Sequence, residues 1–266
     1  MLALVLPQVL ARRRARWREL ELGERDFARA REIFAKRLAG GRQLPRPAMY
    51  RALVDGGISP AGQRGVHILS RLAHEGHLCF AAREGKQHAF ALLDAWVPPA
   101  RSLERDEALA QLAGRYFTGH GPATLRDFAW WSGLPMPEAR AGLEMARPRL
   151  EQERLGQETY WFSDTVRARA RSPSTVLLPA FDEYLVAYRD RSAALDPAHE
   201  REVNHLLSPT LVEDGRVVGT WTRTLERRGV RLQVRLFDRS RRPDPVQLEA
   251  AAKRYGAFVG RPLVLS

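Results

Sequence analysis

The 266-residue sequence predicts an α+β protein in which two tandem winged helix-turn-helix modules precede a mixed, β-rich C-terminal domain. Three observations predict this fold. Amphipathic segments with helical spacing occur in threes, and each group is followed by two short segments of alternating polarity. The same order occurs twice, with equivalent helix ends at Gly57 and, 76 positions later, at Gly133. From about residue 174 onward the pattern is that of strands.

The first module is predicted at residues 25–97, after a segment 1–24 that we interpret as a linker helix or the remnant of a preceding module. Phe27, Ala30 and Phe34 share one face of its first helix, which ends before two glycines. The predicted helices are Phe27–Leu38, Pro45–Asp55 and a third that follows Ser59-Pro60 and runs to about Glu75, and the predicted strands are Leu78–Ala81 and Gln87–Leu93.

The second module is predicted at residues 101–166. Thr124 and Asp127 have the spacing of a capping box, so they mark the start of its middle helix. Trp130 and Trp131 lie about 100° apart on that helix. One is predicted to fill the module's core and the other to pack on a neighbouring module, while stacking on a nucleobase is the alternative. The other elements are helices at Arg105–Phe117 and from Pro137, and strands at Arg149–Arg154 and Thr159–Ser163.

The C-terminal domain is predicted at residues 174–266. Asp214-Gly215 between two apolar segments is a strong signal for a two-residue hairpin. The predicted strands are Thr175–Pro179, Leu211–Glu213, Arg216–Val218, Gly219–Leu225 and Val230–Phe237, and a helix over Pro245–Phe258 follows them.

The charge favours an anionic partner such as nucleic acid or a lipid surface. Forty-three basic residues against 31 acidic ones give a net charge of +12. Nearly all of the basic residues are arginines, whose guanidinium groups suit phosphates and guanine edges, although a genome rich in G and C also raises the arginine content. A single cysteine, Cys79, excludes an intrachain disulfide framework and fits a reducing compartment. We expect a cytoplasmic, nucleoid-associated protein without a membrane span.

The third helix of the first module has the pattern of a recognition helix. Apolar Val66, Leu69 and Leu72 lie opposite a polar face. We expect that polar face to contact duplex DNA, together with the turn of the following hairpin; an ordinary solvated basic face is the alternative. The predicted DNA-binding residues are Gln63, Arg64, His67, Arg71 and His74 on the helix, and Arg83 and Lys86 at the turn.

The last hairpin predicts a second basic surface. Apolar residues from Val230 to Leu236 alternate with polar ones, which predicts one apolar and one cationic face. A cationic ribbon can lie on the phosphate backbone, while an edge hairpin protected by its charges is the alternative. The predicted DNA-binding residues of this ribbon are Arg223, Arg227, Arg228, Arg231 and Arg235.

No metal site, cofactor or catalytic residue is predicted. The spacing of His74, His77, Cys79 and His88 matches no standard zinc pattern. No Gly-x-Ser-x-Gly or phosphate-binding loop occurs. The acidic residues Asp182, Glu183 and Asp190 could hold magnesium, but pairing with Arg189 and Arg191 is the favoured interpretation.

Three blocks of sequence resemble a known family: Gly119–Leu134, Leu177–Tyr184 with Tyr188–Arg191, and Gly215–Trp221. The chain is similar, over nearly its whole length, to the winged-helix DNA-binding family that includes the bacterial DNA glycosylases of interstrand-crosslink repair. This resemblance implies tandem winged helices that form a concave cationic surface for duplex DNA. It also implies hydrolysis of the N-glycosidic bond at alkylated bases by a Gln-x-Gln or Gln-x-Asp motif in an N-terminal module.

This sequence contains neither motif and begins about one module later than the family pattern. In the family's reaction the paired side chains hold the attacking water at the anomeric carbon, so the resemblance predicts DNA binding more firmly than catalysis. The alternative is a non-catalytic DNA-binding protein such as a transcription regulator.

Overall fold

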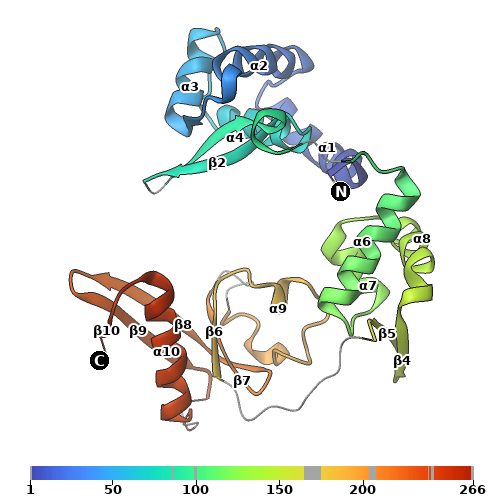
Figure 1. The fold of residues 1–266 in the computed structure, drawn as a ribbon, viewed down its shortest axis with the longest axis vertical. Coiled ribbons are helices and arrows are strands. Elements are labelled where there is room, and N and C mark those ends of the chain that lie inside the picture. Colours follow the sequence, from blue (N-terminus) through green and yellow to red (C-terminus); the bar gives the residue numbers. More distant parts are fainter. Residues whose placement is uncertain are drawn as a thin grey trace. The chain divides into compact units, whose positions relative to one another are not determined.

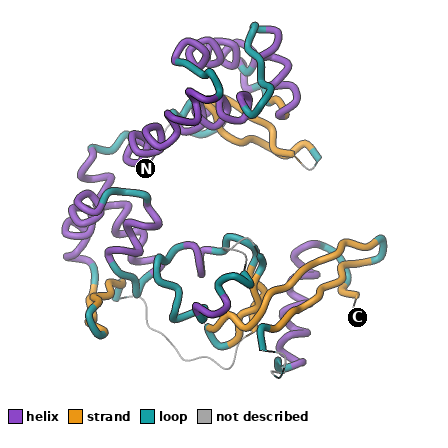
Figure 2. Tube along the Cα trace, turned by 180° about the vertical axis from the view of Figure 1, so that it is seen from behind, coloured by secondary structure: helices purple, strands orange, loops and turns teal. Residues whose placement is uncertain are grey.

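A computed structural model describes residues 2–85, 87–98, 101–164, 175–203, 208–238, 240 and 243–264 of the chain. The chain divides into two compact units, Met1–Leu112 and Ala113–Ser266. The order of helices and strands can be followed in Figures 1 and 2. Among the described residues, no helix has the length and apolar character needed to cross a bilayer.

The N-terminal unit has the predicted order of three helices followed by a hairpin, preceded by one additional long helix. The elements are α1 (Leu2–Glu19), α2 (Glu24–Arg37), η1 (Ala39–Gly41), β1 (Leu44–Pro45), α3 (Arg46–Asp55), α4 (Arg64–His74), β2 (Leu78–Glu84), β3 (Gln87–Leu92) and α5 (Leu93–Trp96). Strands β2 and β3 are antiparallel, and β1 pairs with the other edge of β3. The predicted third helix begins later than expected, because Gln63 has a left-handed backbone conformation.

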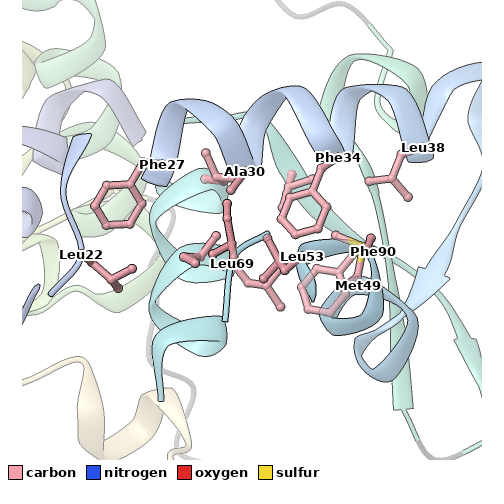
Figure 3. Close-up of a cluster of buried hydrophobic side chains, with 14 of the residues drawn as sticks. Leu22, Phe27, Ala30, Phe34, Leu38, Met49, Leu53, Leu69 and Phe90 are labelled. Carbon is pink, nitrogen blue, oxygen red and sulfur yellow. The ribbon is translucent and has the colours of Figure 1, made fainter. Parts of the chain in front are cut away.

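The core of this unit lies where α2, α3 and α4 meet. Phe27, Ala30 and Phe34 of α2 are buried on one face, as their spacing predicted (Figure 3). They belong to one apolar cluster with Leu53 of α3 and Leu69 of α4. Burial of such side chains contributes about 1.5–3 kcal/mol each, so this cluster fixes the three helices against one another.

A second run of three helices and a hairpin follows. Its elements are α6 (Arg105–His120), which crosses the boundary between the units, α7 (Leu125–Ser132), α8 (Met136–Ala146), η2 (Arg147–Arg149), β4 (Glu151–Leu155) and β5 (Glu158–Phe162). The equivalent helix ends agree, since Gly57 and Gly133 both have positive φ, 80° and 72°. The apolar residues that follow them, Ile58 and Leu134, are both buried. The division into modules at 25–97, 101–166 and 174–266 stays a prediction.

The rest of the chain forms a five-stranded sheet with a helix packed on it, as the mixed β-rich prediction requires. Its elements are β6 (Thr175–Leu178), α9 (Glu183–Val186), η3 (Pro197–His199), β7 (Thr210–Glu213), β8 (Arg216–Glu226), β9 (Gly229–Leu236), α10 (Pro245–Val259) and β10 (Leu263–Val264). The strand order is β10-β9-β8-β7-β6, and the pair β10–β9 is parallel whereas the other pairs are antiparallel. The two strands predicted at 216–218 and 219–225 are one strand, β8.

The predicted turn between β7 and β8 is confirmed. Asp214 and Gly215 have φ values of 48° and 80°, the left-handed pair that a two-residue hairpin of this type needs. Helix α10 packs on the sheet, where the rings of Tyr255 and Trp221 lie 5.0 Å apart. The Trp221 indole nitrogen donates to the Leu178 carbonyl at 2.8 Å, which ties β8 to the far end of β6.

Candidate nucleic-acid interface

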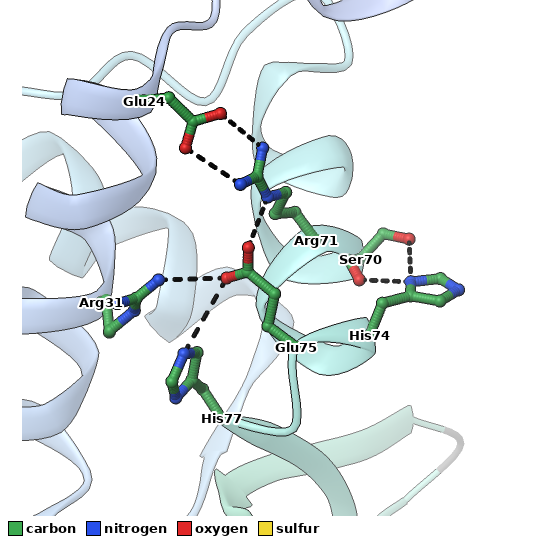
Figure 4. Close-up of polar contacts among 7 residues, drawn as sticks. All are labelled: Glu24, Arg31, Ser70, Arg71, His74, Glu75 and His77. Atoms are coloured by element: carbon green, nitrogen blue, oxygen red, sulfur yellow. Dashed lines mark hydrogen bonds and ion pairs between the residues drawn. The ribbon is translucent and has the colours of Figure 1, made fainter. Parts of the chain in front are cut away.

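The predicted recognition face of α4 is packed inside the N-terminal unit. The Arg71 guanidinium donates to both carboxylate oxygens of Glu24 at 2.9 Å, and its Nε donates to Glu75 at 2.7 Å (Figure 4). The same group lies 4.8 Å from the ring centroid of Trp17 and 4.6 Å from that of Phe27. Only 9% of the Arg71 side chain is exposed, so the prediction that it faces a DNA groove is wrong.

Arg64 is held in the same way. Its Nη1 donates to the carbonyls of Leu20 and Glu21, and its Nη2 lies 3.5 Å from the Asp26 carboxylate. Leu20 and Glu21 belong to the turn between α1 and α2, and Asp26 belongs to the first turn of α2. The predicted orientation of Arg64 toward DNA is therefore wrong for the same reason as that of Arg71: the first helices of the chain cover this side of α4.

Other polar residues of α4 and its N-cap also have partners within this unit. Arg13 of α1 donates to Ser70, and Arg16 donates to Gln63 at 3.0 Å. His74 contacts the Ser70 carbonyl of its own helix at 2.6 Å (Figure 4). Val66, expected on the buried face, is 40% exposed. Helix α4 thus uses its charged face for packing against α1 and α2, and the pattern of α4 alone does not indicate this.

His67 faces this packed side and provides a test of it. Burial lowers the pKa of its imidazole below the ordinary 6.5, as do the nearby Arg13 and Arg16, and its Nδ1 has no described hydrogen-bond partner. The folded state therefore prefers neutral His67, so its contribution to stability is present above about pH 6.5 and is lost as the pH falls.

We expect the free energy of unfolding of the wild type to fall relative to that of His67→Asn when the pH is lowered from about 8 to about 5. Urea denaturation of both proteins at the two pH values measures it. A difference between the two proteins that does not change with pH would show that the protonated form of His67 is also accommodated.

The β2–β3 hairpin carries one of the exposed arginines of this unit. Arg83 is exposed and has no partner among the described residues, whereas Lys86 lies outside them. On β2, Phe80 is 60% exposed and its ring lies 5.2 Å from that of His88 on β3. Burial raises the pKa of the neighbouring Cys79 thiol. No group of three or more His, Cys, Asp or Glu residues suited to a metal ion occurs in the described part of the chain.

The β8–β9 ribbon of the C-terminal unit keeps only part of the predicted cationic face. Arg227 and Arg228 are the two residues of its turn, since Glu226 pairs with Gly229, and both are exposed. Neither has a partner among the described residues. Among the described residues of this ribbon, Arg227 and Arg228 are therefore the two arginines whose guanidinium groups are available to bind a ligand.

The other three arginines of the ribbon are occupied. Arg231 pairs with Glu226 at 2.6 Å, and Arg235 pairs with Glu202 at 2.8 Å. Arg223 lies opposite Leu232, so it shares the apolar face and contacts Tyr255 of α10. The prediction of a single cationic face is wrong for Arg223, because residues directly opposite in an antiparallel pair point to the same side.

Helix α7 forms the junction between the second helical group and the strand-rich part of the same unit. Its predicted capping box is present, with Thr124 Oγ1 accepting from the Asp127 backbone N–H and the Asp127 carboxylate accepting from the Thr124 N–H at 2.9 Å. The second carboxylate oxygen of Asp127 accepts from the backbone N–H of Arg189 at 2.8 Å. A single buried carboxylate thus starts the helix and also fixes the segment after α9.

The two tryptophans of α7 bind this same segment. The indole nitrogen of Trp130 donates to the Val186 carbonyl at 3.1 Å, and that of Trp131 donates to the Glu183 carboxylate at 3.0 Å. Trp130 remains 54% exposed, with the Arg191 guanidinium 5.4 Å from its ring centroid. Tyr116, Phe117 and Phe128 form the buried aromatic core of this module. Trp131 is half-buried and its ring lies 5.0 Å from that of Tyr116, so the tryptophan predicted to fill the core packs at its edge.

The acidic cluster does not pair with the neighbouring arginines as predicted. Asp182 caps α9 by accepting from the Tyr184 N–H, and Glu183 lies 3.4 Å from the His120 ring nitrogen. The Ser192 N–H donates to Asp190 at 2.9 Å, and this hydrogen bond lowers the pKa of the Asp190 carboxyl. The Arg191 Nε donates to the Leu185 carbonyl. These carboxylates therefore organise the backbone of the loop.

Comparison with known proteins identifies the family. A sequence profile described as "DNA glycosylase AlkZ-like" matches residues 1–258. The chain belongs to the AlkZ-like DNA glycosylase family. An interstrand DNA cross-link repair glycosylase from Streptomyces sahachiroi is 29% identical over 170 residues, which are 58% of this chain and 45% of the relative. The chain thus matches less than half of the length of that curated relative.

A solved structure supports the fold of this AlkZ-like chain. The DNA glycosylase AlkZ of Streptomyces sahachiroi superposes with a TM-score of 0.72 over 95% of this chain and 72% of that protein, at 22% sequence identity. Two of the sequence blocks that resemble the family meet in the structure, since Asp127, Trp130 and Trp131 all contact residues 183–190. Spacing along the sequence alone does not indicate this contact between distant segments.

Proposed function

We propose that this AlkZ-like chain binds duplex DNA, mainly through the sugar-phosphate backbone, with winged-helix modules as its scaffold. The observation that carries the proposal is the pair Arg227 and Arg228, adjacent, exposed and without a described partner at the tip of a long hairpin. A net charge of +12 supports it, because duplex DNA attracts such a surface without regard to sequence. On the N-terminal unit, we propose the exposed Arg83 as a further DNA contact. Lys86 is proposed as a contact from the sequence alone.

The test replaces both tip arginines, as Arg227→Gln with Arg228→Gln. Each lost phosphate contact flattens the plot of log affinity against log salt by about 0.9, so we expect the slope to fall in magnitude by about 2. The matched control is Arg115→Gln with Arg140→Gln, which removes the same charge from two exposed arginines that also lack described partners. Fluorescence anisotropy over a salt series gives both slopes. Equal slopes for the wild type and the tip variant would remove the hairpin from the interface.

Family membership also favours a specific enzymatic activity on the bound DNA. The name of the curated relative states repair of interstrand DNA cross-links by a glycosylase, and we propose hydrolysis of the N-glycosidic bond of alkylated bases for this chain as well. Residues for this reaction are not assigned, since the chain contains no Gln-x-Gln or Gln-x-Asp. Incubation with mustard-treated duplex followed by an assay for abasic sites tests it. Abasic sites would support the glycosylase, and their absence would leave a non-catalytic DNA-binding protein, such as a transcription regulator.

A further inference from the structure

A cavity of about 540 Å³ lies within the C-terminal unit, between the start of α7, strand β5 and the loop after α9. Tyr160, Tyr184 and Tyr188 contribute aromatic rings to its lining. The volume lies in the range of about 300–1,000 Å³ that is usual for sites of small organic groups. Neither the DNA-binding proposal nor the glycosidic reaction has assigned a role to this cavity.

Hydrogen bonds within the protein fix most of the lining. The Tyr184 hydroxyl donates to the Gly215 carbonyl at 2.6 Å, and the Tyr188 hydroxyl donates to the His120 carbonyl at 2.7 Å. Asp127, which also lines the cavity, accepts from the backbone N–H groups of Thr124 and Arg189. Arg126 pairs with Glu158 at 3.2 Å. The walls are therefore already in place before any ligand arrives.

Two donors of the lining remain without a partner among the described residues. One is the Tyr160 hydroxyl, and burial together with the nearby Asp190 and Asp127 raises its pKa, so that it stays protonated. The other is the guanidinium of Arg189, an exposed residue of the lining whose backbone N–H donates to Asp127. The carboxylates of the lining are engaged within the protein: Asp127 and Asp190 accept backbone N–H groups, and Glu158 pairs with Arg126. Tyrosine rings with one hydroxyl donor, and with an arginine that these carboxylates do not pair with, suit an aromatic ligand that is rich in acceptors and carries its negative charge at that arginine.

We propose that this cavity receives one unpaired nucleotide of DNA, with its base against the tyrosine rings and its phosphate at Arg189. The Tyr160 hydroxyl then donates to an acceptor atom of the base. Stacking of a base on aromatic side chains contributes about 1–3 kcal/mol, which offsets the cost of taking a base out of the helix when that base is damaged or already unpaired. This inference rests on the proposed DNA binding and adds recognition of an extrahelical nucleotide to it.

The experiment compares three duplexes of one sequence: fully paired, carrying a one-adenine bulge, and carrying an abasic bulge at the same position. We expect the wild type to bind the adenine bulge about tenfold more tightly than the paired duplex and to show little preference for the abasic bulge. Arg189→Gln and Tyr160→Phe should reduce the preference toward one while keeping the affinity for paired duplex within about twofold. Tyr160→Phe keeps the ring, and Arg189→Gln changes an exposed side chain, so we expect both variants to keep the fold, which circular dichroism checks.

Arg140→Gln, on α8 and outside the lining, is the matched control and should leave the preference for the adenine bulge over the paired duplex at its wild-type value. Loss of preference in the two cavity variants alone supports the proposal. An equal preference for the abasic bulge, or a preference that survives both cavity variants, overturns it, because the protein would then recognise a flexible backbone elsewhere. Failure to bind even the paired duplex would instead contradict the proposed DNA binding.

Discussion

Replacing Arg71 with alanine will lower the free energy of unfolding of the N-terminal unit by about 3 kcal/mol. The substitution leaves the Glu75 carboxylate, whose side chain is only 12% exposed, without its nearest cation, and it removes the guanidinium that lies over the Trp17 and Phe27 rings. Breaking a buried ion pair usually costs about 3–5 kcal/mol, and the lower end applies here because the Glu24 side chain is 80% exposed. Arg31 lies 3.1 Å from Glu75 and still neutralises part of the charge of that carboxylate in the variant.

Urea denaturation followed by tryptophan fluorescence measures this loss, since Trp17 lies in the affected cluster. The control is Arg51→Ala, which removes an exposed arginine of the same unit that has no described partner and should change stability by less than about 0.5 kcal/mol. If Arg71→Ala keeps the wild-type stability but flattens the salt dependence of DNA binding, Arg71 is a phosphate contact and the packed arrangement is contradicted.

Arg71 also shows where periodicity stops being informative. The helical pattern of α4 correctly separates polar from apolar positions, because 3.6 residues per turn place Arg64, Arg71 and His74 together. Periodicity reports which residues share a face, and it does not report which face is covered when another helix packs on the polar one. The residues that could have indicated this are Glu24 and Asp26, which offer carboxylates to the arginines from a distant part of the chain.

Features set by neighbouring residues could be predicted from the sequence. The capping box at Thr124, the left-handed Gly133 and the Asp214-Gly215 turn all depend on residues within four positions of one another. The α+β class and the order of elements follow from these local signals together with the apolar patterns. Arg227 and Arg228 are exposed because they form the two-residue turn of the predicted hairpin, which is also a local feature.

Long-range pairing accounts for the errors at the candidate interface. Arg235 meets Glu202, 33 positions away, and no local pattern links them. Arg223 was grouped with Arg231, although the strand register places Arg231 opposite Thr224 and puts Arg223 on the other face. A two-residue turn fixes this register, so counting outward from Arg227 and Arg228 would have separated the two arginines. The cavity near Tyr160 likewise requires segments that only the folded chain brings together.

Asp127→Asn will have the second large effect. It will lower the free energy of unfolding by about 3 kcal/mol, and the damage will be centred on the junction of α7 with the loop after α9. The buried carboxylate accepts hydrogen bonds from the Thr124 N–H and hydroxyl on one oxygen and from the Arg189 and Asp190 N–H groups on the other. In asparagine, an NH₂ group replaces one of the two carboxylate oxygens. This NH₂ donor then meets either the Thr124 donors or the backbone N–H groups of Arg189 and Asp190, with which it cannot form a hydrogen bond. Hydrogen bonds to charged groups contribute about 1.5–3 kcal/mol each, and one side of the network must break.

Amide hydrogen exchange locates the loss, because it reports protection at single backbone positions. In Asp127→Asn we expect faster exchange at position 127, at Arg189 and at Asp190. Thr124→Val is the matched control, because it removes the capping hydroxyl at a cost of about 1 kcal/mol and leaves both loop hydrogen bonds in place. It should therefore speed exchange at position 127 alone. Unchanged protection of Arg189 in Asp127→Asn would mean that the tryptophan contacts of α7, rather than this carboxylate, hold the loop in place.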